Sequence, residues 1–460
     1  MQPVLTRAEM GAADAAALVA ASHDTLVGRA GTAVAHAALR MLEGAYGRHV
    51  VVVAGKGSNG ADARVAAAFL ARRGVRVQLF AAAETPPSLP ACDLVIDGAY
   101  GTGFRGTYEA PEVEPGTPVL AIDIPSGVDA DSGSALGSPV RATRTVTFAA
   151  YKPGLLQGDG PDYSGEVEVA DIGIAVGTPR TALMEDADIA RLLPVRVRQG
   201  HKWSAAVGVA AGSPGMEGSA VLCARGALAA GAGMVRLGSP GDPTAAWPTE
   251  AVRLHLPATG WAPVFLGAIA KCRAAVIGPG LGTDDATQKE IRAVIAAADV
   301  PLVVDADGLT ALGESKAARR VLADRRAPTI LTPHDGEYRR LVGAPPGGDR
   351  IAAARDLAGQ LGVIVLVKGA LTAVAAPDDL DPDVLLSAAG VPALATAGTG
   401  DVLAGVIGAF LARGVPAHAA AALAAHVHGR AAARGPREGL VAGDLPAHLS
   451  DVLSGARPDG

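Results

Sequence analysis

The chain has 460 residues, which is more than a single hydrophobic core usually organises, so at least two domains are expected. Hydrophobic residues make up 49% of the chain and charged residues 19%, a composition that supports large cores and excludes extensive disorder. The net charge is −6 without a basic stripe, which excludes nucleic acid as an expected partner. The three cysteines form no CxxC pair, the start of the chain does not resemble a signal peptide, and the apolar runs are too short to span a membrane. We therefore expect a cytoplasmic protein with no membrane partner.

Helical and strand patterns alternate through the first part of the chain. An alanine-rich segment over 7–42 predicts helix, and the β-branched run Val50–Ala54 predicts a buried strand. A glycine turn over 55–60 then leads into a helix that is expected to end near Arg73. Further strands are predicted at 75–80, 94–97, 119–123, 144–150 and 167–172.

The same alternation returns in the second part of the chain. The segment 177–200 is charged and contains two prolines, so we place a domain boundary within it. Alternating strands and helices are typical of a parallel sheet covered by helices. The sequence therefore predicts two consecutive three-layer α/β domains, at residues 1–182 and 183–460. Strands of the second domain are predicted at 206–210, 274–277, 302–305, 329–331 and 363–367.

The turn Gly398-Thr-Gly-Asp401 runs directly into an apolar, helix-compatible segment over 402–413. A glycine turn that opens a helix directs unpaired N–H groups and the positive end of the helix dipole at one point, which suits a phosphate. A carboxylate beside such a site repels phosphate, but it is well placed to take a proton from a hydroxyl that attacks phosphorus. The pairing predicts phosphoryl transfer with Asp401 as the base.

Four other turns follow predicted strands of the second domain. Ligands of open α/β sheets bind outside the carboxyl ends of the strands, where all four turns are expected to lie. Taken singly, residues such as Asp307 or His334 could equally be helix caps or solvated loop residues. Together with the turn at 398–401, the four turns predict a nucleotide site, and they are Gly278–Gly282, Asp305–Gly308, Thr332–Glu337 and Lys368-Gly369.

With Lys202 and Gly215–Ala220, these motifs resemble in order and spacing the ribokinase-like, ADP-dependent NAD(P)H-hydrate dehydratase domain, over residues 183–460. The resemblance implies a ribokinase-like fold and a nicotinamide cofactor hydrated on its reduced ring as the substrate. ADP phosphorylates the added hydroxyl, and phosphate then leaves as the double bond re-forms. Two departures leave the required chemical groups in place: residues 203–206 replace a glycine-rich segment, and Ser219 replaces an alanine.

The resemblance also implies roles for individual residues. Asp401 is the expected general base, and Mg²⁺ is expected to bridge the phosphates through ligands that the spacing does not assign. The transferring phosphoryl group is expected to bind to Gly398, Thr399 and Gly400. The adenosine part of ADP is expected to contact Lys368, Gly369, Ala370, Leu371 and Thr372. The hydrated substrate is expected to contact Ala220, Gly282, His334 and Asp401.

The first domain also carries a glycine-rich turn, Gly55-Lys-Gly-Ser-Asn-Gly60, between a strand and a helix. A dinucleotide-binding fold needs an acidic residue about twenty positions later, and Glu84 comes too late. Instead, Asp97 and Asp123 end the next two predicted strands. Carboxylate, amide and hydroxyl oxygens gathered at one edge suit a hard cation, although these aspartates could also simply cap loops.

These turns resemble the NAD(P)H-hydrate epimerase domain, over residues 1–181, with a Rossmann-like fold. Within the glycine-rich motif, Ser58 replaces an asparagine, and Ala61 and Ala63 replace glycines, so an altered turn is expected because alanine resists positive φ. The resemblance implies a potassium ion held by Asn59, Asp97 and Ser126, and a role for Asp123 in proton transfer. It implies substrate contacts from Ser58, Asn59, Gly60, Ala61, Asp62, Gly101, Thr102, Gly103, Phe104, Arg105, Gly106, Thr107 and Asp123.

The sequence therefore predicts a bifunctional enzyme that repairs hydrated NADH and NADPH. The first domain interconverts the R and S hydrates, and the second dehydrates the S form with ADP, releasing AMP and phosphate. A homo-oligomer, tetramer or larger, is expected. One alternative is a small-molecule hydroxyl kinase with a ligand-binding first domain, and another makes the first domain a non-catalytic scaffold. A hydride-transferring dehydrogenase is disfavoured because it leaves the turn at 398–401 without a function.

Overall fold

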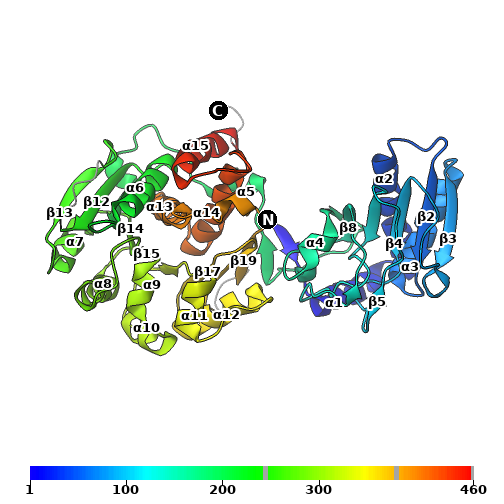
Figure 1. Cartoon of the computed structure of the whole chain (residues 1–460), viewed down its shortest axis with the longest axis horizontal. Coiled ribbons are helices and arrows are strands. Elements are labelled where there is room, and N and C mark those ends of the chain that lie inside the picture. The colour runs from blue at the N-terminus through cyan, green and yellow to red at the C-terminus, as the bar shows by residue number, and fades with distance from the viewer. Residues whose placement is uncertain (242–246, 378–382, 457–460) are drawn as a thin grey trace. The chain divides into compact units, whose positions relative to one another are not determined.

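The computed structural model describes residues 1–241, 247–377 and 383–456. The chain forms two compact units (Figure 1). The first is Gln2–Arg180, and the second is Thr181–Gly460 together with Met1. The division falls after residue 180, close to the boundary proposed after residue 182.

The charged segment around this division is not an unstructured linker. It contains β10 (Thr181–Leu183) and α5 (Asp186–Leu192), and both belong to the second unit. Ala182, Ile189 and Leu193 are buried in the core of that unit.

The first unit contains a parallel sheet in the order β3-β2-β4-β6-β8-β9. Alternate residues of β2 face two different cores: Val50 and Val52 pack with the helices, whereas Val51 and Val53 pack on the opposite face. A strand buried on both faces needs a continuous β-branched run, which is why the sequence predicted it. The strands are β2 (His49–Ala54), β3 (Arg76–Ala81), β4 (Leu94–Gly98), β6 (Val119–Ile122), β8 (Arg144–Phe148) and β9 (Glu166–Ala170), with short β1 (Gln2–Val4), β5 (Tyr108–Glu109) and β7 (Gly137–Ser138).

The predicted helix over 7–42 is two helices. The side chain of Ser22 accepts a hydrogen bond from the N–H of Thr25, so it caps a new helix and ends the first one. The helices of this unit are α1 (Arg7–Ala20), α2 (His23–Leu42), α3 (Ser58–Arg72) and α4 (Gly160–Ser164), with 3₁₀ turns at Ala82–Glu84 and Pro153–Leu155.

The second unit contains one large mixed sheet, which includes the order β10-β19-β18-β17-β16-β15-β14-β11-β12-β13. Its strands are parallel except where β18 runs antiparallel to both of its neighbours. Because β11, β14, β15, β16 and β17 are parallel, the turns that follow them leave the same edge of the sheet. The strands not yet bounded are β11 (Ala206–Ala210), β12 (Met234–Pro240), β13 (Val252–Leu256), β14 (Ala274–Ile277), β15 (Leu302–Val304), β16 (Thr329–Leu331), β17 (Ile364–Val367), β18 (Thr372–Ala375) and β19 (Val384–Ser387).

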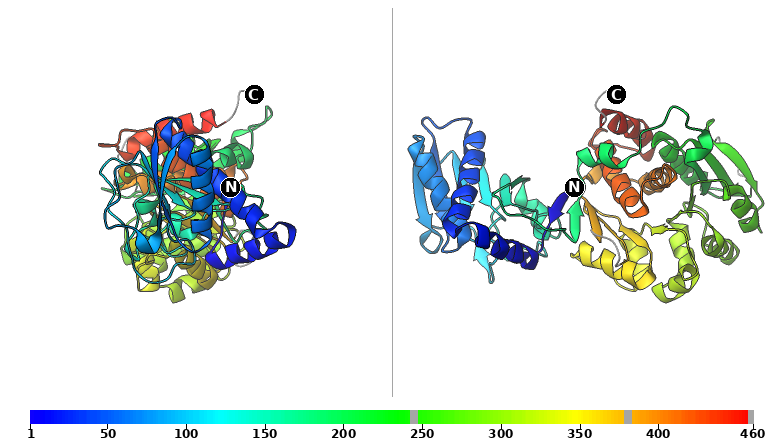
Figure 2. Two further views of the ribbon diagram at one scale, coloured as in Figure 1. Left: turned by 90° about the vertical axis from the view of Figure 1, so that its right-hand side faces the viewer. Right: turned by 180° about the vertical axis from the view of Figure 1, so that it is seen from behind.

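Helices cover both faces of this sheet, as Figures 1 and 2 show. The main core lies on the face covered by α6, α13 and α14, and α8 to α12 cover the other face. The predicted α/β class is therefore confirmed, with helices on both faces of the large sheet. The helices are α6 (Glu217–Ala229), α7 (Ala262–Ile269), α8 (Asp285–Ala297), α9 (Asp307–Leu312), α10 (Ser315–Leu322), α11 (Asp335–Val342), α12 (Arg350–Leu361), α13 (Thr399–Ala412), α14 (Ala417–Ala432) and α15 (Leu445–Gly455), with 3₁₀ turns at Lys202–Ala205, Pro392–Leu394 and Ala442–Asp444.

Across residues 1–241, 247–377 and 383–456, no helix combines the length and the apolar character needed to cross a lipid bilayer.

Candidate active sites

The first candidate site lies at the start of α13, where the glycine turn was predicted to open a helix. Gly398 is the N-cap residue and has a φ of +87°. A Cβ atom at this position would lie 2.5 Å from Leu222 Cδ1, so both backbone conformation and space require glycine. The hydroxyl of Thr399 donates to the carbonyl oxygens of Leu394 and Thr396 at 2.9 and 3.0 Å. These bonds fix the helix start and the direction of its N–H groups.

Asp401 lies in the first turn of α13 and is partly buried. Burial raises the pKa of its carboxyl group to about 7, against the lowering effect of a hydrogen bond from Ser219. The negative charge of Asp305 raises this pKa further, and the positive charge of Lys368 lowers it. A carboxyl group that gains and loses a proton near neutral pH suits a general base.

Lys368 connects this helix start to the neighbouring strand ends. Its Nζ donates to Asp305 Oδ1 at 2.5 Å, and only 1% of the Asp305 side chain is exposed. Burial opposes the charge of Lys368, but Asp305 and Glu337 raise its pKa, and the net shift is upward. Nζ also lies 3.4 Å from the position that a Cβ atom of Gly400 would occupy. An ammonium group and the N-terminus of a helix therefore meet at one point, which favours a phosphate.

The glycine turn after β14 packs directly on the next strand end. A Cβ atom at Gly278 would lie 1.9 Å from the carbonyl oxygen of Asp305, so only glycine permits this approach. The N–H of Gly282 donates to Asp307 Oδ2 at 2.8 Å. Asp307 therefore joins the two turns and is not simply a solvated loop residue.

His334 is the N-cap of α11 and has a structural role of its own. Its Nδ1 accepts a hydrogen bond from the N–H of Gly336 at 2.9 Å, and Glu337 Oε2 accepts one from the N–H of His334 at 2.9 Å. The imidazole is 55% exposed, with Nε2 lying 3.4 Å from Glu337 Oε1. The cap therefore fixes an imidazole ring that remains accessible to a ligand.

Ala220 differs from the other predicted substrate contacts. Its side chain is fully buried in the core beside α13, close to Gly212. A substrate contact at this position would have to involve the backbone.

The predicted adenosine loop, Lys368–Thr372, is held by an arginine that the sequence analysis missed. Arg350 donates to the carbonyl oxygen of Leu371 at 3.1 Å, to that of Lys368, and to Asp335 Oδ1 at 2.8 Å. A Cβ atom at Gly369 would lie 2.6 Å from the Arg350 guanidinium carbon. No motif marks Arg350, because it lies at the start of α12 and acts only on backbone atoms of the loop. Within the loop, Leu371 is buried, Ala370 is exposed, and the hydroxyl of Thr372 donates to the carbonyl of Gly369 at 3.2 Å.

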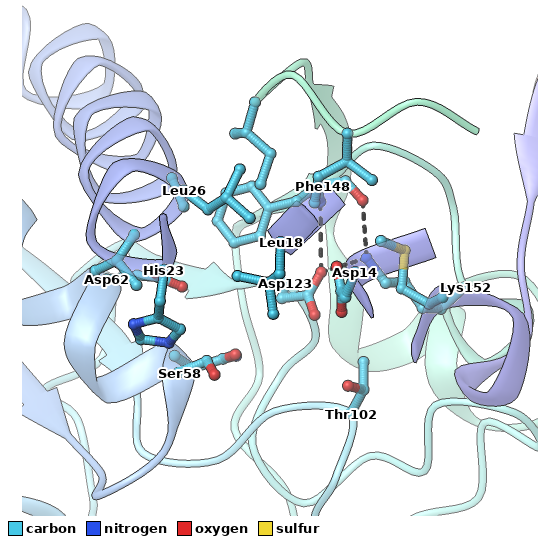
Figure 3. Close-up of a pocket in the computed structure, with 16 residues that line it drawn as sticks. Asp14, Leu18, His23, Leu26, Ser58, Asp62, Thr102, Asp123, Phe148 and Lys152 are labelled. Atoms are coloured by element: carbon cyan, nitrogen blue, oxygen red, sulfur yellow. Dashed lines mark hydrogen bonds and ion pairs between the residues drawn. The ribbon is translucent and has the colours of Figure 1, made fainter. Parts of the chain in front are cut away.

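The second candidate site is a cavity in the first unit (Figure 3). Asp123 lies at its wall with a φ of +66°, which is unusual for a residue other than glycine. Its Oδ1 accepts hydrogen bonds from Lys152 and, at 3.0 Å, from the hydroxyl of Thr147. Lys152 is 1% exposed and also donates to the hydroxyl of Thr147 at 2.8 Å and to the carbonyl of Phe148 at 3.1 Å. The sequence analysis missed Lys152, although a Lys-Pro-Gly turn after a strand in a lysine-poor chain was an available signal.

Asp62 lies on α3 and lines the same cavity. Burial, followed by the charge of Asp123, raises the pKa of its carboxyl group to about 8. In the part of the chain that the structure describes, the Asp62 carboxyl has no hydrogen-bond or ion-pair partner of its own. The cavity is therefore lined by a paired carboxyl group on Asp123 and an unpaired one on Asp62, besides that of Asp14.

Two of the three predicted potassium ligands approach one backbone carbonyl, and the third, Asp97, is hydrogen-bonded to one of them. The Ser126 backbone N–H and hydroxyl donate to the two carboxyl oxygens of Asp97 at 2.8 and 2.7 Å. The Ser126 hydroxyl and the Asn59 side-chain amide both approach the carbonyl oxygen of Tyr100, at 3.1 and 3.5 Å. Among the described residues, no group of three or more His, Cys, Asp or Glu side chains could hold a metal ion. An oxygen set of carboxylate, amide, hydroxyl and carbonyl instead fits a hard cation with weak geometric demands, such as potassium.

The expectation of an altered glycine turn is wrong for structural reasons. The helix α3 begins at Ser58, so Ala61 and Ala63 lie in regular helix and have no positive φ. Alanine therefore causes no backbone strain at these two positions. Gly60 is the position that needs glycine, because a Cβ atom would lie 2.0 Å from the carbonyl oxygen of Gly55.

The segment 101–107 reaches the cavity only in part. Thr102 and Ser58 are among its lining residues. Gly101 allows the close approach of Asn59, since a Cβ atom would lie 2.4 Å from Asn59 Oδ1. The rings of Phe104 and Tyr100 pack together at 4.4 Å and belong to the core on the other face of the sheet. The structure gives no cavity contact to Gly103, Arg105, Gly106 or Thr107.

Comparison with known families covers both units. The model of the NAD(P)H-hydrate dehydratase family matches residues 207–454, and that of the YjeF-related protein N-terminus matches residues 23–92 and 82–154.

Solved structures resemble the second unit. The ADP/ATP-dependent NAD(P)H-hydrate dehydratase of Bacillus subtilis, co-crystallised with ATP and Mg²⁺, is 28% identical with a TM-score of 0.50, covering 60% of this chain and 99% of its own. A ribokinase-like superfamily protein of Enterococcus faecalis is 19% identical, with a TM-score of 0.53 over 61% of this chain and 98% of its own, and it supports the fold alone.

Curated relatives span both units. A bifunctional NAD(P)H-hydrate repair enzyme of Mycobacterium tuberculosis is 40% identical over 82% of this chain and 82% of its own length. Enzymes of the same description from Mycobacterium leprae and Moorella thermoacetica are 38% and 33% identical over 97% and 98% of this chain, and over 96% of their own length in both cases. The chain therefore belongs to the family of bifunctional NAD(P)H-hydrate repair enzymes.

Proposed function

We propose that this protein repairs hydrated NADH and NADPH at two sites. The first unit interconverts the R and S hydrates, and the second uses ADP to dehydrate the S form, with release of AMP and phosphate. The observation that carries the proposal is Asp401 in the first turn of α13, beside the Lys368–Asp305 pair. A carboxyl group with a pKa near 7 beside an anion site is what a hydroxyl phosphorylation requires.

The dehydration follows from these groups in two steps. Asp401, when ionised, takes the proton of the substrate hydroxyl as its oxygen attacks the β-phosphorus of ADP, and the bond to AMP breaks. The N–H groups at the start of α13 and the ammonium of Lys368 stabilise the charge on the transferring phosphoryl group. The C–O bond to phosphate then breaks and the neighbouring ring carbon loses a proton, which restores the double bond.

The nucleotide would be held by the turn at 398–400 and by the loop Lys368–Thr372 that Arg350 shapes. Mg²⁺ would reach the site with the phosphates, as its presence with ATP in the Bacillus subtilis relative suggests. The nearby carboxylates are already engaged, because Asp305 pairs with Lys368 and Asp307 accepts from Gly282. Phosphate and water oxygens would therefore supply most of the Mg²⁺ ligands.

One assay tests both activities in the full-length protein. A mixture of R and S hydrated NADH is incubated with the protein, ADP or ATP is added, and the near-ultraviolet absorbance of the reduced ring is followed. Return of the complete absorbance supports both activities, and return of only the S fraction supports dehydration alone. A stable phosphorylated product without recovery of NADH would instead support the kinase alternative.

We also propose that potassium supports the site of the first unit through Asn59, Asp97 and Ser126. Replacement of potassium by sodium should slow the interconversion of the hydrates several-fold, because sodium is smaller and fits the same oxygen set poorly. Dehydration of pure S hydrate, measured in the same two buffers, should not change. An equal loss of both activities would contradict a potassium site in the first unit.

A homo-oligomer, tetramer or larger, and a cytoplasmic location remain predictions. Light scattering by the purified full-length chain tests the first, and cell fractionation tests the second.

A further inference from the structure

We propose that Asp62 and the Asp123–Lys152 pair are the acid and the base of the epimerisation, with the proton on Asp62 and the charge on Asp123. The inference rests on the proposed function of the first unit and assigns the reacting groups within its cavity. Five titratable side chains line this cavity, from α1, α2, α3 and the ends of the sheet, and they are Asp14, His23, Asp62, Asp123 and Lys152.

The Asp123 carboxylate is surrounded by hydrogen-bond donors and a buried cation. Lys152 is 1% exposed, and its ammonium donates to the Asp123 carboxylate, to the hydroxyl of Thr147 and to the carbonyl of Phe148. The hydroxyl of Thr147 and, at 3.4 Å, the N–H of Phe148 also donate to the same oxygen of Asp123. Hydrogen bonds and a buried cation both favour the charged form of a carboxyl group.

Asp62 has the opposite surroundings. It is 5% exposed and faces the same cavity from α3, without a cation or a hydrogen-bond donor beside its carboxyl group in the described residues. In Figure 3 it lies on the side of α3, apart from the pair that Asp123 forms with Lys152. A buried carboxyl group near another carboxylate keeps its proton, and its pKa of about 8 agrees with this arrangement. Two carboxyl groups held in different protonation states are a common way of dividing acid and base roles.

The chemistry of the substrate requires both roles. Water adds to the reduced ring so that the hydroxyl lies on the carbon bonded to the ring nitrogen, because that carbon best carries positive charge. Asp62 donates its proton to this hydroxyl, the C–O bond breaks, and water leaves as the nitrogen lone pair forms a C=N bond. A water molecule then attacks the other face of the same carbon, gives a proton to Asp123, and returns the electron pair to nitrogen.

This sequence inverts one centre and consumes no other reactant. At its end, Asp62 is ionised and Asp123 is protonated. The reverse reaction starts from that state, with the two carboxyl groups exchanging roles, and proton exchange through water restores the first state. Lys152 is a positioning residue, because it acts on the substrate only through Asp123.

The test measures R/S interconversion of hydrated NADH by chromatography, with the full-length chain, without ADP, and after subtraction of the uncatalysed rate. Asp62→Asn should lower the rate by about a hundredfold or more, and Lys152→Met by about tenfold or more, with partial rescue by Lys152→Arg. Asp14→Asn is the matched control, since it removes a carboxyl group from the same cavity but from neither proposed role, and it should cost at most about threefold. Dehydration of pure S hydrate with ADP should be unchanged in every variant. This control shows that the second unit is folded and active in each of them.

The outcomes separate the inference from the function on which it rests. If the unaltered protein does not interconvert the hydrates, the epimerase assignment fails, and the inference fails with it. If the unaltered protein is active and Asp62→Asn keeps a rate within threefold, only the acid–base assignment is overturned. An equal loss in Asp14→Asn would also overturn it.

Two further measurements need no variant. The interconversion rate of the unaltered protein should fall as the pH rises above about 8, because Asp62 must carry a proton, and a rate that stays constant would contradict this role. In heavy-oxygen water each inversion should introduce one labelled oxygen, and retention of the original oxygen would overturn the proposed C–O cleavage.

Discussion

The two sites of this chain use similar charged groups in different surroundings. Each contains a lysine–aspartate pair beside a second carboxyl group with a raised pKa: Lys368–Asp305 with Asp401 in one unit, and Lys152–Asp123 with Asp62 in the other. The Lys368 side chain is 19% exposed and faces the start of α13, whereas Lys152 is 1% exposed and lines a cavity with both apolar and titratable walls. By the proposed function, a phosphate enters and leaves the site at the start of α13, which favours an accessible cation. By the proposed mechanism, the cavity of the first unit transfers protons to and from the hydroxyl of an uncharged ring, which favours a buried pair.

The largest expected effect is on Asp401, the proposed base of the second unit. Asp401→Asn keeps the shape of the side chain but removes the proton acceptor, so ADP-dependent dehydration of S hydrate should fall by about 10²–10⁴-fold. Nucleotide binding, measured by calorimetry, should persist because the helix start and Lys368 are unchanged. Interconversion of R and S hydrates by the same variant is the internal control and should match the unaltered protein. Dehydration within tenfold of normal would show that another group is the base.

The next effect concerns how much each lysine–aspartate pair contributes to the stability of its unit. Lys152→Met leaves a buried carboxylate without its cation and should destabilise the first unit by about 3–5 kcal/mol. Lys368→Met should cost less, about 1–3 kcal/mol, because the Lys368 side chain is 19% exposed against 1% for Lys152, so its loss opens a path for water to the Asp305 carboxylate. Chemical denaturation, with the unfolding of each unit followed separately, tests this order of free-energy losses. The double variant Lys152→Met with Asp123→Asn should recover part of the loss, since it removes both partners. A Lys368→Met variant that is less stable than Lys152→Met would contradict the comparison.

The difference between the two sites also explains how far the sequence could predict them. The turn at 398–401 and the strand ends that face it lie at one edge of a parallel sheet, so spacing alone placed them together. Lys152 and Arg350 were missed because neither lies in a glycine-rich motif. Lys152 comes 29 residues after its partner Asp123, and the pair forms only when two strand ends and a 3₁₀ turn meet.

The sequence analysis missed the strand β12 for a related reason. The strand β12 ends in Gly-Ser-Pro, which are turn-forming residues, and its pairing with β11 on one side and β13 on the other outweighs that local preference. Lysines beside glycine turns show the same limit. Lys368 lies in a site, but Lys56 and Lys202 are exposed. A glycine neighbour indicates a turn, whereas burial depends on the tertiary structure.

The two carboxyl groups with raised pKa values predict opposite responses to pH. Asp401 must be ionised to accept a proton, so dehydration should fall about tenfold for each pH unit below its pKa of about 7. Asp62 must be protonated to donate, so interconversion should fall about tenfold for each unit above its pKa of about 8. Rates of both reactions measured on one preparation between about pH 6 and pH 9 test this contrast. Parallel profiles would mean that the two carboxyl groups do not have the roles assigned to them.

The smallest expected effect concerns the adenosine loop of the second unit. Arg350 donates to two carbonyl groups of this loop and to Asp335, and lysine cannot reproduce that geometry because its ammonium is a single point of charge. Arg350→Lys should raise the KM for ADP about fivefold, the equivalent of one hydrogen bond, with little change in kcat because Asp401 and the helix start are untouched. Arg339→Lys on the exposed surface of α11 is the matched control and should leave KM unchanged. The interconversion of R and S hydrates uses no nucleotide and should not respond to either change. A fall in kcat at constant KM would place Arg350 in the phosphoryl transfer itself, and the loop would then contribute to the chemical step in the second unit.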